Sequence, residues 1–453
     1  MVLDEQAAET RYRMLETIRQ YAHDKLVDAN EREQSRDQHL HVFAQLAVQT
    51  QPILETAQRT AWLSRLESEN DNLRAALGWA VESDLETARW MAGMLERFWF
   101  YGDRLSEAHT WYARVLNTGE RTKVTKGLAL ALLSSGCVSL NLEHLDEAQV
   151  SLESSVVMWQ KLGDQNWVAV SLAWCAYLLL QRGEGERART IYAEHESLFR
   201  ASGGVSLVWT LSCWGTANAT VRRDDPTAKA LLDEALSLAH TQQDPFTILL
   251  AYSSLGDWAV MQGDYPTARR HFLEALVWRR QLGTRWIIAS GLRQVANLMC
   301  LQGDYQQAEP LYTEALAMAR ALGDQHSEAG IAQALGEVVI HRGDIEQATI
   351  LLAESLSSFR KWADALGIAR CLIGFVNLLQ AQKDMERAAH LLGFVEAWLE
   401  SNQLHLVIFD HANYARGIAA ARAQLDEAAF TAAWAEGRAM MLEQAIELAM
   451  KDE

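Results

Sequence analysis

The chain has 453 residues, of which 49% are hydrophobic and 22% charged, a balance typical of folded globular proteins. Its 41 basic and 59 acidic side chains give a net charge of −18, so nucleic-acid backbones repel it and direct nucleic-acid binding is not expected. The longest apolar stretch, 167–180, is shorter than the roughly 20 residues of a membrane span, and no signal peptide opens the chain. We therefore expect a cytoplasmic protein without membrane contact, whose five cysteines are free thiols packed as small apolar groups.

The first 90 residues lack the periodicity of the rest of the chain. The pattern predicts a short strand over 11–15 and an amphipathic helix over 16–27. We divide the chain into an N-terminal segment (1–30), a helical capping segment (31–90), a repeat array (91–440) and the end of a C-terminal helix (441–453).

Alanine recurs every 40 residues along the array, at positions 108, 148, 188, 228, 268, 308, 348, 388 and 428. A period of this size indicates helical hairpins that stack in a row, about nine of them here. We attribute the recurring alanine to the closest approach of the two helices of a hairpin, where a larger side chain would push the backbones apart.

Residues 252–283 illustrate how one repeat is built. Its first helix ends at Gly263, which suits a left-handed C-terminal cap. Asp264 is a suitable N-cap for the second helix, and Pro266 fits its first turn. The neighbouring repeats keep the capping aspartate at Asp224, Asp304, Asp344 and Asp384.

These repeats resemble the tetratricopeptide repeat. The family's ladder of large and small residues is matched by Tyr252, Leu255, Gly256, Ala268, Phe272 and Ala275, and again by Leu335, Gly336 and Ala348. The standard repeat has about 34 residues, so a period of 40 implies longer helices of roughly 17 residues. The resemblance implies an all-α, right-handed superhelical solenoid that binds ligands on the concave face formed by its first helices.

Two aromatic residues share one phase of adjacent repeats. Trp174 and Trp214 lie one repeat apart, and Tyr177 lies one turn after Trp174. An aromatic ladder in the core explains them without a ligand. Alternatively, they form a stacking platform on the inner wall for a sugar, a nucleobase or an aromatic peptide side chain.

A polar column shares the phase of the concave face. It consists of Asp257, Asn297, Glu337 and Asn377, and about one turn before its members lie Arg293, Gln333 and Arg370. A solvated face needs no function. As a binding stripe, the column would hydrogen-bond an extended ligand. The candidate binding residues are these seven together with the three aromatic residues.

Signatures of catalysis are lacking. The 13 histidines are scattered, and neither the pair His39 and His41 nor the pair His405 and His411 has helical i, i+4 spacing with a third ligand nearby. We find no G-x-S-x-G motif. We therefore assign no catalytic residue, metal or cofactor, and expect a binding protein rather than an enzyme.

The two ends of the chain resemble STAND signal-transduction ATPases, in which an NB-ARC-type core is followed by a winged helix and a tetratricopeptide array. Residues 11–22 are similar to the end of the winged helix, and 72–77 and 98–103 to the start of the array. Residues 391–393 and 430–439 are similar to the closing segment of such arrays in bacterial transcriptional regulators. No G-x-x-x-x-G-K-[ST] loop occurs, so the ATPase core is missing from this sequence.

The resemblance implies the sensor arm of a longer regulator, with 1–30 as a winged-helix remnant. Its expected partners are a protein, a peptide or a small-molecule inducer, and the ATPase core of the same regulator. The alternative is a stand-alone tetratricopeptide scaffold that grips a peptide or helix of another protein. The oligomeric state stays open.

Overall fold

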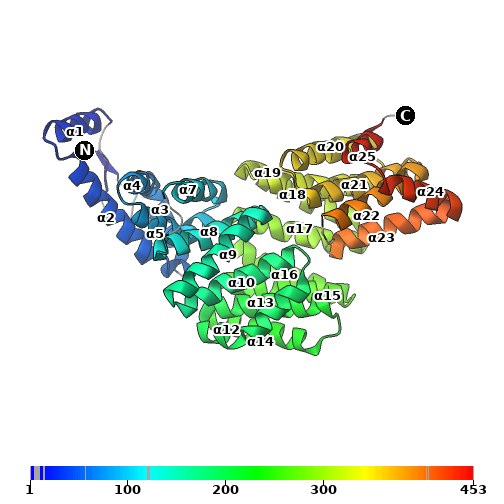
Figure 1. The fold of residues 1–453 in the computed structure, drawn as a ribbon, viewed down its shortest axis with the longest axis horizontal. Helices are drawn as coiled ribbons and strands as arrows, with labels where there is room; N and C mark the ends of the chain where they lie inside the picture. The colour runs from blue at the N-terminus through cyan, green and yellow to red at the C-terminus, as the bar shows by residue number, and fades with distance from the viewer. Residues whose placement is uncertain are drawn as a thin grey trace. The chain divides into compact units, whose positions relative to one another are not determined.

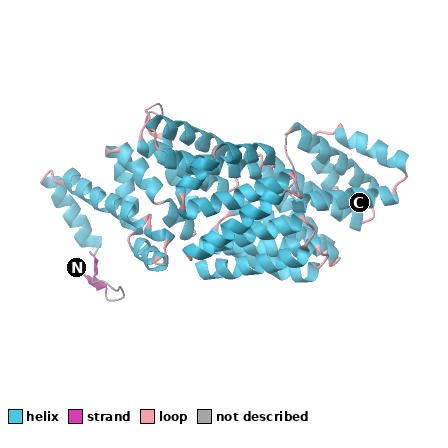
Figure 2. Cartoon of the chain, turned by 90° about the horizontal axis from the view of Figure 1, so that it is seen from below, coloured by secondary structure: helices cyan, strands magenta, loops and turns pink. Residues whose placement is uncertain are grey.

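The computed structural model describes residues 2–4, 11–13, 16–56, 58–119, 123–402, 404, 406 and 408–451. This part of the chain is almost entirely helical, and Figure 2 shows the short strands near the N-terminus. Among the described residues, no helix combines the length and the apolar character that crossing a bilayer requires.

The chain forms two compact units. Unit 1 consists of Met1–Phe98 and Thr110–Ala131, and unit 2 of Trp99–His109 and Leu132–Glu453. These limits differ from the predicted division at residues 30, 90 and 440, which stays a prediction.

Unit 1 begins with strands β1 (Val2–Asp4) and β2 (Arg11–Arg13), which pair antiparallel with Leu3 opposite Tyr12. The predicted strand is therefore present at 11–13, whereas residues 14 and 15 lie outside the described part. The predicted helix at 16–27 is α1 (Glu16–Asp28). The unit continues with α2 (Arg32–Thr50), the 3-10 turn η1 (Ile53–Glu55), α3 (Arg59–Ser68), α4 (Asn70–Ser83) and α5 (Leu85–Met94).

Three helices have residues in both units: α6 (Glu96–Tyr101), α7 (Leu105–Asn117) and α8 (Lys126–Asn141). The helices that follow belong to unit 2, and all of them except α11 are labelled in Figure 1. They are α9 (Leu145–Leu162), α10 (Gln165–Gln181), α11 (Gly185–Glu194), α12 (Glu196–Ser202), α13 (Gly204–Val221), α14 (Pro226–Gln242), α15 (Pro245–Met261), α16 (Tyr265–Leu282), α17 (Arg285–Leu301), α18 (Tyr305–Leu322), α19 (Gln325–His341), α20 (Ile345–Lys361), α21 (Ala365–Ala381), α22 (Met385–Ser401), α23 (Ile408–Gln424), α24 (Glu427–Arg438) and α25 (Leu442–Met450).

The helices of unit 2 repeat with the predicted period. First helices begin at Gln165, Gly204, Pro245, Arg285, Gln325 and Ala365, in steps of 39 to 41 residues. Helices α15 to α22 have 17 or 18 residues each, the predicted length. In each hairpin the first helix packs against the second, and first helices such as α13 and α15, or α19 and α21, also pack side by side. The fold is therefore an all-α superhelical repeat.

The caps follow the sequence pattern with one shift. Gly263 has φ of 76°, and the carboxylate of Asp264 accepts a hydrogen bond from the Thr267 backbone N–H at 3.1 Å. In the preceding hairpin the cap is Asp225 rather than the predicted Asp224. The reason is that α14 begins at Pro226, so that Asp225 occupies the N-cap position.

The recurring alanines are fully buried at eight of the nine positions, from Ala108 to Ala388. Ala428 is exposed. The reason is a shift in the repeat. A step of 40 residues from α21 and α22 predicts earlier starts than those observed for α23, at Ile408, and for α24, at Glu427. Phe430 and Ala433 are therefore buried in place of Ala428. Glycine replaces alanine at the closest contact of α22 and α24, where a Cβ on Gly437 would lie 1.9 Å from the His390 carbonyl oxygen.

Candidate functional site on the first-helix layer

All ten predicted binding residues lie on first helices, which we call the first-helix layer: α10, α13, α15, α17, α19 and α21. Trp174 and Tyr177 lie on α10, Trp214 on α13 and Asp257 on α15. The remaining six are Arg293 and Asn297 on α17, Gln333 and Glu337 on α19, and Arg370 and Asn377 on α21.

The turn between α8 and α9 reaches this layer through Glu143. Its backbone has φ of 62°, the left-handed conformation that glycine adopts at the same phase in Gly183, Gly263, Gly303 and Gly343. A residue other than glycine pays for this conformation with roughly 1–2 kcal/mol. The Glu143 carboxylate lies 3.3 Å from Nδ1 of His326 and 3.6 Å from a guanidinium nitrogen of Arg293.

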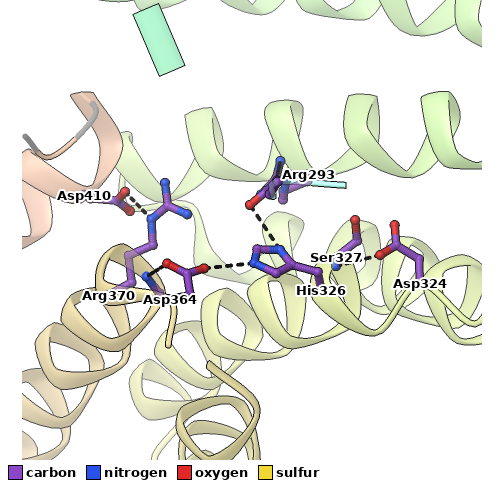
Figure 3. A network of polar contacts seen from close by, with 9 residues as sticks. Arg293, Asp324, His326, Ser327, Asp364, Arg370 and Asp410 are labelled. Carbon is purple, nitrogen blue, oxygen red and sulfur yellow. Dashed lines mark hydrogen bonds and ion pairs between the residues drawn. The ribbon is translucent and has the colours of Figure 1, made fainter. Parts of the chain in front are cut away.

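The contact continues as a chain of charged groups, drawn in Figure 3. His326 Nε2 donates to the Asp364 carboxylate at 2.8 Å, and Asp364 in turn caps α21 by accepting from the Gly367 N–H at 2.9 Å. Arg370 Nε donates to Asp410 at 2.7 Å. We call these six residues the Glu143 network: Glu143, Arg293, His326, Asp364, Arg370 and Asp410.

The Glu143 network thus contains three cationic side chains and three carboxylates, which are partly shielded from solvent. Burial favours the neutral ring of His326, but its hydrogen bond with Asp364 and its ion pair with Glu143 outweigh burial and raise its pKa to about 9. Burial likewise disfavours the Glu143 carboxylate, yet the ion pair with His326 and the charge of Arg293 hold its pKa well below the usual range. His326 is therefore charged at neutral pH, and the network holds its charges in pairs.

A second turn makes the same kind of contact. Asp103 also has positive φ, 58°, at the glycine phase, and its carboxylate accepts from the Trp286 backbone N–H at 3.1 Å and from Arg285 Nε at 3.2 Å. Thr284, the N-cap of α17, makes no capping bond with its own side chain and instead donates to the Tyr101 carbonyl at 3.1 Å. Asp103 therefore takes over the capping of α17.

Both turns contact a helix far along the chain. Glu143 meets His326, which is 183 residues later (326 minus 143), and Asp103 meets Trp286 with the same separation. Within unit 2 the array thus touches itself after about four and a half repeats of 40 residues. The polar contacts made by the Glu143 turn and by the Asp103 turn hold this self-contact together, and we call them its two ties.

Glu337 lies at the centre of a neighbouring polar cluster. Its carboxylate accepts hydrogen bonds from Gln333 Nε2 and from Asn413 Nδ2 of α23. Burial raises the pKa of Glu337 to about 8, and the negative charge of Asp410 adds to this effect. The structure therefore brings Gln333 and Glu337 together, as a binding stripe requires, but their hydrogen bonds are made within the chain.

Asp257 belongs to a third polar cluster. It accepts from Gln294 Nε2 at 3.1 Å, and Gln294 accepts from Arg279 at 3.1 Å. Burial raises the pKa of Asp257 to about 6 and lowers that of Arg279 to about 10. Gly291 leaves room for Arg279, because a Cβ there would lie 2.5 Å from the Arg279 Cδ.

The other predicted residues have different surroundings. Trp174 packs against Trp209 and Tyr177, with ring centroids 4.4 and 5.9 Å away, and both Trp174 and Tyr177 are half-buried. Trp214 is only 8% exposed and stacks on Tyr192, as the core-packing alternative expects. Asn297 accepts a hydrogen bond from the Tyr312 hydroxyl, and Asn377 is half-buried.

The sequence analysis missed several residues that take part in these contacts: Glu143, His326, Asp364, Asp410, Gln294 and Arg279. The sequence did contain one signal for Glu143, because an acidic residue occupies a position at which several other repeats have glycine. The remaining residues carry no pattern that separates them from solvated side chains. His405, one of the histidines considered as metal ligands, lies outside the described residues.

Comparison with known proteins supports the repeat assignment. A tetratricopeptide repeat model matches residues 287–361. Three curated relatives, one from Mycobacterium bovis and two from strains of Mycobacterium tuberculosis, are named as candidate HTH-type transcriptional regulators. Each is 27% identical over 258 residues, covering 54% of this chain and 28% of the relative. The match thus spans less than a third of those relatives.

Solved structures with similar architecture include a Rap protein complexed with Competence and Sporulation Factor, which has 16% identity, covers 90% of this chain and all of the other, and gives a TM-score of 0.48. A STAND protein with a tetratricopeptide repeat sensor from Pyrococcus horikoshii has 16% identity, covers 75% of this chain and 53% of the other, and gives a TM-score of 0.47. Yeast Tom70 has 13% identity, covers 91% of this chain and 97% of the other, and gives a TM-score of 0.44.

Proposed function

We propose that this chain is a non-catalytic tetratricopeptide sensor domain of a STAND-type ATPase regulator, and that it binds a protein, a peptide or a small-molecule inducer through its first-helix layer. The repeat match at 287–361 and the helical hairpins support an interaction domain. The much longer relatives named as transcriptional regulators support the regulatory setting. A cytoplasmic location, and the absence of direct nucleic-acid or membrane binding, belong to the same proposal.

The observation that carries this proposal is the Glu143 network. A strained turn places a carboxylate on Arg293 and His326 of repeats far along the chain. A ligand with its own contacts to these two cations competes with Glu143 and releases one tie of the self-contact. Because a ligand shifts an equilibrium only when it prefers one state, the released form must bind it more tightly.

The proposal is tested by a thermal-shift screen of metabolites, nucleotides and short peptides against the purified chain. We expect at least one compound to raise the melting temperature of the wild type and of Arg270→Gln, which changes an exposed residue of the second helix α16. The same compound should lose its effect on Arg293→Gln and Asn297→Ala. A stabilising compound that is insensitive to both inner substitutions would place the binding site elsewhere.

A stand-alone scaffold is the second candidate, because the repeat match itself carries no sign of an attached ATPase. The two candidates differ in what the gene encodes around this sequence. A nucleotide-binding domain and a winged helix in the same reading frame favour the sensor. A stop codon directly upstream favours the scaffold.

A further inference from the structure

A cluster of metal-ligating side chains lies next to the Glu143 turn. We propose that His109, His144 and Glu147 bind a divalent cation of the zinc class. His109 lies on α7, His144 is the N-cap residue of α9, and Glu147 lies in the first turn of α9. All three residues belong to unit 2, and the site would join α7 to α9.

The donor atoms already approach the geometry of a metal site. His109 Nε2 lies 2.9 Å from a Glu147 carboxylate oxygen, and His144 Nδ1 lies 3.9 Å from the same oxygen. One ligand atom from each residue lies within 4.8 Å of the other two. Because zinc ligands stand about 2.0–2.2 Å from the metal, small side-chain rotations bring all three donors into range.

His144 provides a second, independent indication. Its Nδ1 is buried and, in the described part of the chain, has no hydrogen-bond partner. Buried ring nitrogens normally have one, so a metal ion would satisfy this atom. His390 forms a comparable pair with Glu436 at 3.0 Å, but its other nitrogen already bonds the Glu386 carbonyl at 2.8 Å.

The charges around the cluster do not oppose a bound cation. The charged His326 ring lies 6.4 Å from the His144 ring, but Glu143 and Asp364 offset its charge, and Asp324 and Glu147 add negative charge near His144.

The donor set selects the class of metal. Two imidazoles and one carboxylate suit zinc and related divalent transition metals, whereas calcium and magnesium prefer oxygen ligands alone. Three protein ligands leave a coordination position for water or for a group of a bound partner. Because His144 directly follows Glu143, a bound metal would also fix the turn that carries the first tie.

The test is titration of zinc into the full chain, stripped with a chelator and free of any histidine tag, followed by calorimetry. Cobalt is used in parallel, because its visible absorption reports the coordination. We expect one equivalent to bind the wild type, and Glu147→Gln to weaken binding by at least about tenfold, since loss of even a residue supporting a ligand costs this much. The double variant His109→Ala/His144→Ala should lose the cobalt spectrum.

Glu436→Gln is the matched control, because Glu436 and Glu147 are similarly exposed and the carboxylate of each lies within 3.0 Å of one histidine nitrogen. It should bind zinc as the wild type does. Glu147 is 62% exposed, so its substitution leaves the fold intact, which circular dichroism verifies. Wild-type binding that is absent in the micromolar range, or equal in Glu147→Gln and the wild type, overturns the proposal.

Discussion

Glu143 is the residue at which local preference and long-range contact conflict most clearly. The left-handed backbone of its turn favours glycine, yet the Glu143 carboxylate forms ion pairs with His326 and Arg293. Lys383 stands at the same phase with φ of 68° and is exposed. Comparing these two residues therefore separates the free-energy cost of the left-handed backbone from the stabilisation that the Glu143 network contributes.

We predict opposite signs for the same substitution at these positions. Lys383→Gly relieves the left-handed strain and should stabilise the protein by about 0.5–1 kcal/mol. Glu143→Gly relieves the same strain but leaves Arg293 and the nearly buried His326 without their carboxylate partner. We expect it to destabilise the protein by about 1–2 kcal/mol, a value between the usual effects of losing an exposed and a buried ion pair. Urea unfolding of both variants measures this. Stabilisation by both would show that the network contributes nothing to folding.

The titration of Glu337 predicts an unusual pH dependence. Its pKa is raised from 4.5 to about 8 by burial, so the folded state keeps a proton that the unfolded state has released. The free energy of unfolding therefore falls as pH rises across this window. His326 acts in the same direction, because its pKa is also raised. Its contribution to the free energy of unfolding is complete below pH 6.5 and is lost as pH rises through about 9.

We predict that Glu337→Gln flattens the decline between about pH 5 and pH 8, because glutamine cannot ionise. At pH 9 the variant should be more stable than the wild type by at least about 1 kcal/mol, since one pKa unit corresponds to roughly 1.4 kcal/mol. Melting temperatures across the pH range measure this. Glu354→Gln, at an exposed position of α20, should keep the wild-type slope. Parallel curves for all three proteins would contradict the assignment.

At the scale of the helical element, the buried alanine sets how closely two helices approach. Ala268 on α16 is fully buried, whereas Arg270 on the same helix is exposed. We predict that Ala268→Leu destabilises the protein by about 1–3 kcal/mol through overpacking, while Arg270→Leu changes stability little. Calorimetry compares the two variants. Equal melting temperatures would remove the steric explanation of the 40-residue alanine period.

The same element shows how much of the fold the sequence predicted. Gly263, Asp264 and Pro266 mark the end of one helix and the start of the next because capping is local chemistry. The failure at Ala428 has an equally simple reason, since the late start of α23 shifts the frame of α24. Periodicity predicts an element only as long as the spacing between elements is kept.

At the scale of the whole repeat array of unit 2, Asp103 caps a helix 183 residues away. We predict that Asp103→Ala speeds hydrogen exchange of the amides at the start of α17 and lowers the free energy of unfolding by about 1 kcal/mol, the usual effect of losing a cap. Hydrogen exchange with mass spectrometry measures this. Asp304→Ala removes a local cap and should affect the start of α18 instead. Unchanged exchange at 285–288 in Asp103→Ala would show that the long-range cap has no energetic role.

The candidate site divides along the same line. The phase of the repeat correctly placed Arg293, Gln333, Glu337 and Arg370 on first helices, because residues 40 apart occupy equivalent positions in successive hairpins. It gave no indication that His326 faces Glu143 or that Arg370 pairs with Asp410. Their use in ligand binding stays a prediction.

The sequence by itself determined the hairpins of this protein, since helix caps, apolar stripes and a buried alanine act between residues close along the chain. Only the tertiary structure decided which repeats meet across the array. That outcome depends on the small rotation between neighbouring hairpins, summed over about four and a half repeats. The ties at Asp103 and Glu143 and the cluster at His109, His144 and Glu147 therefore emerge only when side chains from separate hairpins are placed together in space.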